Sequence, residues 1–337
     1  MEKIAADLLL KGLAPEGFAD SQPIGLVTTD SREVCPGCIF VAFPGERFDG
    51  HDFAAKALEE GAAYVVLNHP VEGVPAERAV ISPDSYHAMM VMGANYRSQF
   101  HPKVVGVTGS VGKTTTREMI AEALSGGFRV FRTHGNFNSQ VGLPITMSEI
   151  SKGDQIGVIE LGMSEPGELT IIAQIARIAM AVITNIGDAH IEQLGTRENI
   201  LREKLTIQDG LEPGGIVFLN GDDELLKQVR ARDGFETFYY GTGENCDYRA
   251  EDVRMESGTA SFVAVHGEQR VPVRLNVMGA HNVLNALAAL GVADQVGLSM
   301  ARAAKNLEAF HGFSHRQQIF KVGGMAIMDD TYNASPV

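Results

Sequence analysis

A glycine-rich segment of the chain combines the residue types that hold phosphate. Residues Gly109-Ser110-Val111-Gly112-Lys113-Thr114 follow the apolar run Val104–Thr108, and Thr115 continues into a helical pattern. In such a loop the backbone N–H groups and the helix N-terminus face phosphate oxygens, the lysine reaches the outer phosphates, and the threonine hydroxyl suits Mg²⁺. A glycine at Val107 would complete the longer G-x-x-x-x-G-K-[ST] pattern, so this is the shorter form. A merely glycine-rich turn would need no Lys-Thr pair, and we therefore predict a nucleoside triphosphate site.

Two polar residues follow later strands of the same predicted sheet. Glu160 ends the apolar run Ile156–Ile159, and His190 follows a predicted strand that ends in Thr184-Asn185-Ile186. Ligands of open α/β sheets bind outside the carboxyl ends of the strands, where the phosphate loop also lies. A carboxylate and an imidazole beside a triphosphate could hold a cation directly or through water. Each residue alone could be a solvated strand end or a loop histidine, but their joint placement favours function.

Lys204 lies on the apolar side of a predicted helix. Its neighbours on that arc, at about 100° per residue, are Ile200, Leu201, Leu205, Ile207 and Leu211. A buried lysine without a partner is costly and tends to lose its proton, so this amine would be neutral, paired or covalently modified. Alternatively, the stem lies along apolar surface and the ammonium stays in water. The periodicity leaves both readings open.

Several further residues are weaker candidates. Asn282 and Asn285 stand three apart at the start of a predicted helix, where Asn282 could be an N-cap or both amides could read a purine edge. Arg316 could reach phosphate and Asp330 could reach ribose hydroxyls, although lone charged residues usually form solvated surface. The pair Ser31-Arg32 could clamp a phosphate, but its spacing alone favours a polar turn.

These residues need a sheet to bring them together, and the sequence predicts one. Strands and helices alternate after Lys103 in βαβ order, which predicts a doubly wound, mostly parallel α/β sheet. The predicted strands are Val104–Thr108, Arg129–Arg132, Gln155–Leu161, Met180–Ile186 and Gly215–Asn220, and the helices are Thr114–Leu124 and Arg197–Leu211. From 247 to 277 a period of two predicts antiparallel hairpins, before a helix at Asn282–Val296.

The first hundred residues predict a smaller α/β domain. Short apolar runs at Ile39–Phe43, Tyr64–Leu67 and Ala79–Ile81 alternate with helical stretches at Asp52–Gly61 and about 84–98. Pro102 disfavours continued helix, so we place a domain boundary there. The predicted domains are 1–100, 101–313 and 314–337, the last being only the start of a third domain.

Composition limits the class of protein. A chain of 337 residues fits at least two domains, and 28 basic against 42 acidic residues give a formal net charge of −14, which argues against a nucleic-acid partner. No apolar run approaches the roughly 18 residues of a membrane span, and the first twenty residues carry no signal-peptide pattern. Three cysteines are too few for a disulfide framework, and the Cys35-Pro36-Gly37-Cys38 pair has no partners that would complete a zinc site. We expect a cytoplasmic protein.

The order of these motifs resembles that of the Mur ligases, the ATP-dependent amide-forming enzymes of peptidoglycan precursor synthesis. Thr108–Thr114 is similar to the family's phosphate loop, Glu160-Leu161-Gly162 to its metal-binding carboxylate and Asn185–His190 to its histidine motif. Lys204 falls where the family has a carbamylated lysine. The resemblance implies ATP and two Mg²⁺ ions, with metal ligands Thr114, Glu160, His190 and carbamylated Lys204 and catalytic residues Lys113, Glu160, His190 and Lys204.

Within the family, four segments are similar to the ligases that add D-alanyl-D-alanine to UDP-N-acetylmuramoyl-tripeptide. These segments are Asp30-Ser31-Arg32, Gly45–Phe53, Asn136-Phe137-Asn138 with Gly142-Leu143-Pro144, and Asp329–Ala334. The resemblance implies a UDP-binding N-terminal domain, a central ATP-binding domain and a third, Rossmann-like domain in a monomer. It also implies that Ser31 and Arg32 hold the UDP moiety, that Asn136 and Asn138 line the muramoyl-peptide path, and that Asn282, Arg316 and Asp330 contact ATP.

Other readings of the same residues remain open. A sibling ligase that adds the third amino acid would share the motifs, although its histidine motif and the sequence between its second and third domains usually differ. A kinase or another nucleotide-binding protein could use the same loop, but it should place Asp at a strand end for Mg²⁺ and needs no buried lysine. A catalytically silent binding module is the third alternative.

Overall fold

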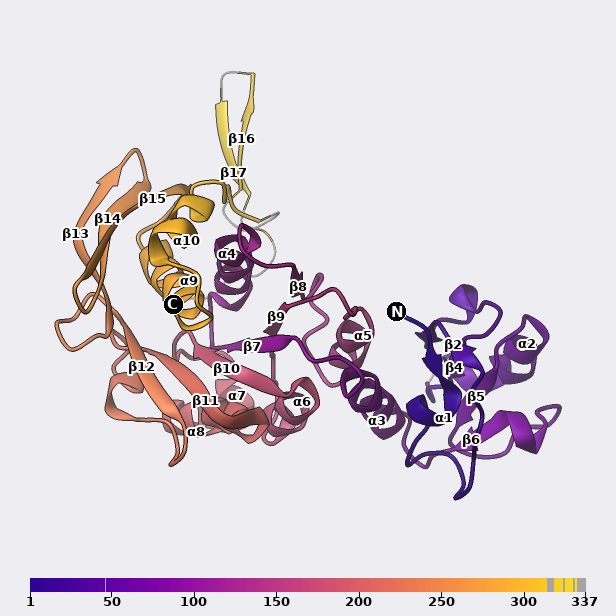
Figure 1. Ribbon diagram of the computed structural model, residues 1–337. Coiled ribbons are helices and arrows are strands. Elements are labelled where there is room, and N and C mark those ends of the chain that lie inside the picture. The colour runs from indigo at the N-terminus through magenta and orange to yellow at the C-terminus, as the bar shows by residue number, and fades with distance from the viewer. Residues whose placement is uncertain (46, 314–317, 324, 330, 332–337) are drawn as a thin grey trace. The chain divides into compact units, whose positions relative to one another are not determined.

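Two compact units interleave along the chain (Figure 1). The computed structural model describes residues 1–45, 47–313, 318–323, 325–329 and 331. One unit comprises Met1–His101 with His134–Gly153, and the other comprises Pro102–Thr133 with Asp154–Val337. The chain therefore passes from the second unit back to the first and returns to the second.

A four-stranded parallel sheet organises the first unit. Its order is β3-β4-β5-β6, from β3 (Val27–Thr28), β4 (Ile39–Val41), β5 (Tyr64–Leu67) and β6 (Ala79–Ile81). Every residue of the two central strands is buried, as expected where both faces of a parallel sheet are covered. The other elements are β1 (Ile4–Ala5), β2 (Pro23–Ile24), α1 (Ala6–Leu9), α2 (Ala54–Glu59), α3 (Ser85–Arg97), and the 3₁₀ turns η1 (Ser31–Glu33), η2 (Gly50–Phe53) and η3 (Ala76–Arg78).

Helix α5 (Gly142–Ser148) belongs to this first unit, although its position in the chain predicts the second domain. It packs against α3, and the two backbones come close at Gly93. A Cβ built at Gly93 would lie 2.9 Å from the Cα atom of Pro144. The buried Leu143 and Met147 give α5 an apolar face for this contact. Packing against α3 therefore places residues 134–153 in the first unit, and no local sequence pattern predicts this.

A nine-stranded sheet organises the second unit. Its order is β15-β14-β13-β12-β11-β10-β7-β9-β8, and it is parallel from β8 to β13 and antiparallel from β13 to β15. This confirms the predicted mostly parallel sheet with antiparallel hairpins. The strands are β7 (Lys103–Thr108), β8 (Val130–Arg132), β9 (Ile156–Glu160), β10 (Ile178–Ile183), β11 (Leu211–Asn220), β12 (Glu236–Gly241), β13 (Tyr248–Glu256), β14 (Thr259–His266) and β15 (Gln269–Met278).

Helices cover both faces of this sheet (Figure 1). On one face lie α4 (Lys113–Ser125), α9 (Asn282–Gln295) and α10 (Met300–Leu307). On the other lie α6 (Glu168–Ala176), α7 (Ile191–Leu194), α8 (Arg197–Leu205) and the 3₁₀ turn η4 (Thr206–Gly210). The remaining described elements are η5 (Leu226–Gln228) and the hairpin of β16 (Gln318–Val322) with β17 (Met325–Asp329). The expected third domain would begin in this last region, which is described only in part.

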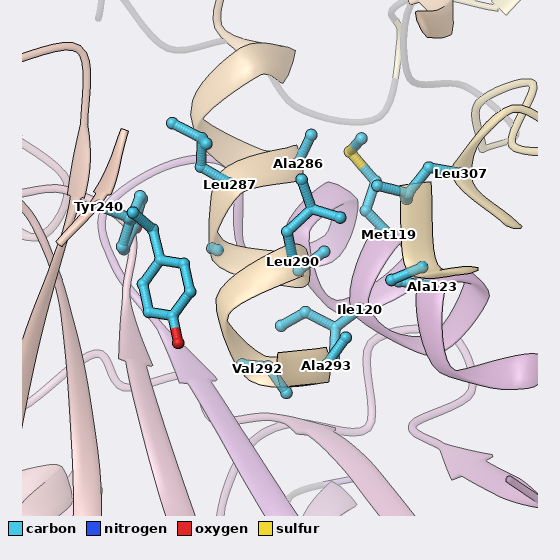
Figure 2. Close-up of a cluster of buried hydrophobic side chains, with 14 of the residues drawn as sticks. Met119, Ile120, Ala123, Tyr240, Ala286, Leu287, Leu290, Val292, Ala293 and Leu307 are labelled. Atoms are coloured by element: carbon cyan, nitrogen blue, oxygen red, sulfur yellow. The ribbon is translucent and has the colours of Figure 1, made fainter. Parts of the chain in front are cut away.

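The core of the second unit lies between the sheet and the first of these helical layers. Figure 2 shows α9 between α4 and the sheet, with Leu290 and Ala293 near Ile120 of α4 and Leu287 on the side of Tyr240. These side chains are fully buried. Burial of this kind stabilises by roughly 1.5–3 kcal/mol per large side chain, so α4 is held firmly beneath the loop that precedes it.

Two predicted elements end earlier in the structure than the sequence suggests. The helix that begins at Arg197 stops at Leu205 and continues as η4, and β10 stops at Ile183 rather than at Ile186. The elements α6, α10 and β12 were not among the predictions at all. Gly210, the last residue of η4, lies against the backbone of Ala173 in α6.

Replacing Gly210 by alanine is expected to lower the free energy of unfolding by about 2 kcal/mol or more. A Cβ at this position would lie 2.1 Å from the carbonyl oxygen of Ala173, and the backbone on both sides would have to move. Denaturant unfolding measures the change. Gly243→Ala is the control, because its new Cβ would lie 3.8 Å from the nearest atom, on Asp222. Equal stability of the two variants would contradict the prediction.

Candidate active site

Two glycines shape the loop between β7 and α4. Gly112 has a φ of 80° immediately before the first residue of α4, a left-handed conformation that favours glycine. Gly109 has a φ of 149°, and a Cβ there would lie 1.9 Å from Oγ1 of Thr184. The loop therefore turns sharply and packs tightly against the end of β10. This geometry lets α4 begin with its N-terminus directed at the loop.

Lys113 and Thr114 begin α4 and use their polar atoms within the site. The Lys113 ammonium donates to the carbonyl oxygens of Gly109 at 2.8 Å and Ser110 at 3.2 Å. The Thr114 hydroxyl donates to Oε2 of Glu160 at 2.8 Å. The structure thus brings together the phosphate loop and the carboxylate that ends β9, as the strand order predicts. Thr115 follows on α4 and is half-buried.

Glu160 belongs to a row of alternating charges that the sequence did not reveal and that runs from the interior to the exposed Arg132. Its carboxylate lies 3.3 Å from Nη1 of Arg117, whose side chain is fully buried. Arg117 also pairs with Glu118 at 2.5 Å, and Glu118 pairs with Arg132 at 2.9 Å. The Thr133 hydroxyl accepts the backbone N–H of Glu160 at 3.0 Å. These contacts orient Glu160 and supply the positive charge that a buried carboxylate requires.

Lys204 is buried, with 2% of its surface exposed, which excludes an ammonium in water. Burial and the positive charge of Lys113 lower its pKa from 10.5 to about 7, against a smaller opposing effect of Glu203. The pKa of His190 is also lowered, first by burial and then by Lys204 and Lys113. The charge of Lys113 thus acts on both His190 and Lys204. His190 has a φ of 66° and precedes α7, so a strained backbone presents it.

Asn285 connects α9 to α4, and Asn282 bonds to Asn285. The Asn285 oxygen accepts from the Thr116 hydroxyl at 2.9 Å, and its amide group donates to Asn282 at 2.9 Å. The amide group of Asn282 donates to the carbonyl of Met278 at 2.7 Å. Asn282 is the first residue of α9 and not its N-cap, which is His281. Both asparagines therefore stabilise the wall of the site behind the loop.

The remaining predicted residues belong to the first unit or lie outside the described residues. Ser31 and Arg32 form η1 in the first unit, where Arg32 pairs with Asp30 at 2.5 Å and lowers the pKa of that carboxyl to about 2. Asn136 and Asn138 also belong to the first unit, in an exposed to half-buried turn. Arg316 and Asp330 lie outside the described residues.

The cluster in the second unit has donors that fit a nucleotide and a divalent cation. The oxygens of Thr114 and Glu160 are already adjacent, and oxygen ligands suit Mg²⁺. The hydroxyl oxygen of Thr108, at the start of the loop, is buried and has no hydrogen-bond partner among the described residues. Across the same part of the chain, no group of three or more His, Cys, Asp or Glu side chains could hold a metal ion. A cation here would need ligands beyond these residue types.

Models of known families match most of the chain. The Mur ligase middle domain matches residues 107–293, and the catalytic domain of the Mur ligase family matches residues 23–134. The first match contains the phosphate loop, Glu160, His190 and Lys204. The chain belongs to the Mur ligase family.

Individual Mur ligases are similar over nearly the whole chain. A UDP-N-acetylmuramoyl-tripeptide–D-alanyl-D-alanine ligase of Bacillus subtilis is 37% identical over 332 residues, 97% of this chain and 71% of the relative. The enzyme of that name from Escherichia coli is 32% identical over 92% of this chain and 69% of the relative. These matches confirm the predicted family and, within it, the predicted resemblance to ligases that add D-alanyl-D-alanine.

Solved Mur ligase structures agree with this assignment. MurF from Acinetobacter baumannii has a TM-score of 0.90 and 32% identity, covering 100% of this chain and 74% of its own. MurF from Thermotoga maritima, solved in complex with ADP, has a TM-score of 0.82 and 31% identity, with coverage of 92% and 71%. A UDP-N-acetylmuramoyl-L-alanyl-D-glutamate–2,6-diaminopimelate ligase is 22% identical at a TM-score of 0.67 and shares the fold.

None of the helices among the described residues is long and apolar enough to cross a membrane.

Proposed function

We propose that this protein joins D-alanyl-D-alanine to UDP-N-acetylmuramoyl-tripeptide with ATP, releasing ADP and phosphate. The observation that carries the proposal is the 37% identity, across 97% of the chain, to a ligase whose name states these substrates. The ADP complex of a similar structure supports ATP as the nucleotide. The protein would act as a cytoplasmic monomer.

The reaction needs an activated carboxylate. The terminal carboxylate oxygen of the tripeptide attacks the γ-phosphorus of ATP, and ADP leaves with the electrons of the broken P–O bond. The amine of D-alanyl-D-alanine then attacks the acyl phosphate, and the tetrahedral intermediate loses a proton to water and expels phosphate as the amide forms. Lys113 would offset negative charge on the transferring phosphoryl group, and the loop would hold that group in line.

The residues of the site would also place two Mg²⁺ ions. When bound, Mg²⁺ neutralises charge on the phosphates and orients them. Thr114 and Glu160 would serve one ion, and His190 and a carbamylated Lys204 would contribute to the second. Carbamylation joins the neutral amine to CO₂ and releases one proton, and the lowered pKa of Lys204 makes that neutral form accessible. The nearby Lys113 charge would stabilise the resulting anion.

The other substrate contacts follow from the resemblance. Ser31 and Arg32 would bind the UDP moiety, and an anion there would share the guanidinium that Asp30 now holds. Asn136 and Asn138 would line the path of the muramoyl peptide. The loop from Gly109 to Thr115, together with Asn282, Arg316 and Asp330, would bind ATP.

Phosphate release from ATP tests the proposal directly. It is measured with UDP-N-acetylmuramoyl-tripeptide present or omitted, and with D-alanyl-D-alanine present or omitted. We expect release to require the tripeptide and to be accompanied by amide product when both substrates are present. Release that depends on neither substrate would rule out the ligase function and favour a simple ATPase.

A further inference from the structure

The segment that follows β10 holds the first half of the phosphate loop. The side-chain oxygen of Asn185 accepts the backbone N–H groups of Ser110 at 3.1 Å and Val111 at 2.9 Å. The carbonyl oxygen of Asn185 also accepts from the Ser110 N–H at 3.1 Å. Two successive loop amides thus converge on one carboxamide that lies 74 or more positions along the chain.

Neighbours of Asn185 make further bonds to the same half of the loop. The Thr184 hydroxyl donates to the carbonyl oxygen of Val111 at 2.6 Å, and the Gly187 N–H donates to the Ser110 hydroxyl at 2.8 Å. Gly109 lies against Thr184 with no room for a side chain. The residues that follow β10 therefore fix the position of residues 109–111.

Successive N–H groups that point to one spot form a concave site that ordinarily takes an anion. Here a neutral oxygen takes that place, and both amides bond to Asn185. The lysine and the threonine of the motif lie in the other half of the loop, at the start of α4. Because the first half of the loop is already fixed, the loop would lose less conformational entropy when a nucleotide binds.

We propose that Asn185 is a positioning residue, which presets the phosphate loop for ATP by holding the amides of Ser110 and Val111 on its side-chain oxygen. The proposal rests on the nucleotide binding proposed above. Asparagine suits the role because its oxygen accepts both bonds without charge. Aspartate would accept them equally well but would add a negative charge beside the triphosphate.

Three variants test this role through amide exchange and ATP binding. In Asn185→Ala both amides lose the side-chain acceptor, whereas Asn185→Asp keeps it. Asn306→Ala is the control, since its amide donates to the carbonyl of Ala123, at the far end of α4. The amide of Val111 is the cleaner reporter, because the Ser110 amide keeps its bond to the backbone of residue 185. Exchange is followed by NMR without nucleotide, ATP binding by calorimetry, and stability by thermal unfolding.

In Asn185→Ala we expect exchange of the Val111 amide to be at least about tenfold faster and ATP affinity to fall about tenfold or more. In Asn185→Asp we expect slow exchange and a melting temperature within about 2 °C of the wild type, but ATP affinity reduced at least about tenfold. Asn306→Ala should lower the melting temperature and leave ATP affinity unchanged.

Unchanged exchange at Val111 in Asn185→Ala, or unchanged ATP affinity in both variants, would overturn the positioning role. Loss of affinity only in proportion to unfolded protein would also overturn it. If the wild type itself binds no ATP, nucleotide binding as proposed is wrong, and the exchange of Val111 distinguishes that failure because it needs no nucleotide.

Discussion

Replacing Lys204 by methionine is expected to stabilise the protein while slowing its ATP-dependent reaction by at least about a hundredfold. The amine is 2% exposed, and its pKa falls from 10.5 to about 7 in the folded state. At neutral pH this shift costs on the order of 4 kcal/mol of stability. Methionine keeps the apolar contacts of the stem and removes that cost, but it cannot become a carbamate. Denaturant unfolding and phosphate release measure the two effects.

The pH dependence of the stability difference identifies its cause. Between about pH 7 and 10.5 the unfolded chain binds more protons at residue 204 than the folded chain does, so wild-type stability from this group rises with pH. The advantage of Lys204→Met should therefore be full below about pH 7 and shrink as the pH rises toward 10.5. Bicarbonate-free buffer keeps the amine unmodified, and the exposed Lys227→Met is the control. An advantage that stays constant across this range would show that the buried charge is not its source.

Replacing Lys113 by methionine is expected to slow phosphate release by about a thousandfold and to weaken ATP binding at least about tenfold. The ammonium now bonds to two carbonyls of the loop, and no other lysine begins α4. Its removal takes away both the loop contacts and the charge that would face the outer phosphates. Lys103→Met is the matched control, because Lys103 is exposed at the start of β7 in the same unit.

A second measurement separates loss of this charge from general damage. The positive charge of Lys113 helps to lower the pKa of both His190 and Lys204. In Lys113→Met the pKa of His190 should therefore rise, as followed by NMR of its ring protons in metal-free protein. If phosphate release falls while the pKa of His190 does not move, Lys113 does not belong to this electrostatic cluster.

Local patterns were sufficient for most strands and helices near the site. Buried parallel strands such as β7 and β9 are continuous apolar runs, and α4 follows a glycine loop, so each leaves a clear signal in the sequence. The ends of α8 and β10 were predicted too late. In the folded chain η4 follows α8 from Thr206, and the Thr184 hydroxyl bonds to the loop. The small helix α5 was missed since its apolar face is short.

Some residues of the candidate site could be predicted from the sequence, and others could not. The sequence was sufficient to identify Lys113, Thr114 and Glu160. Their chemistry follows from their residue types and from their positions at the end of a strand or helix. Arg117 reads as an ordinary helical residue, and Asn185 as part of a strand end. Nothing in the chain around them indicates that one would contact Glu160 and the other would hold the loop.

By itself the sequence determined the α/β class, the phosphate loop and the residues at the edge of the sheet, because these depend on local spacing and on the rule that parallel strands end together. The folded chain alone shows that Lys204 is buried, that Arg117 pairs with both Glu160 and Glu118, and that residues 134–153 join the first unit. Burial, charge pairing and unit membership depend on contacts between segments that are far apart in the chain. Helical periodicity identifies an apolar face, but it does not predict which segment covers that face.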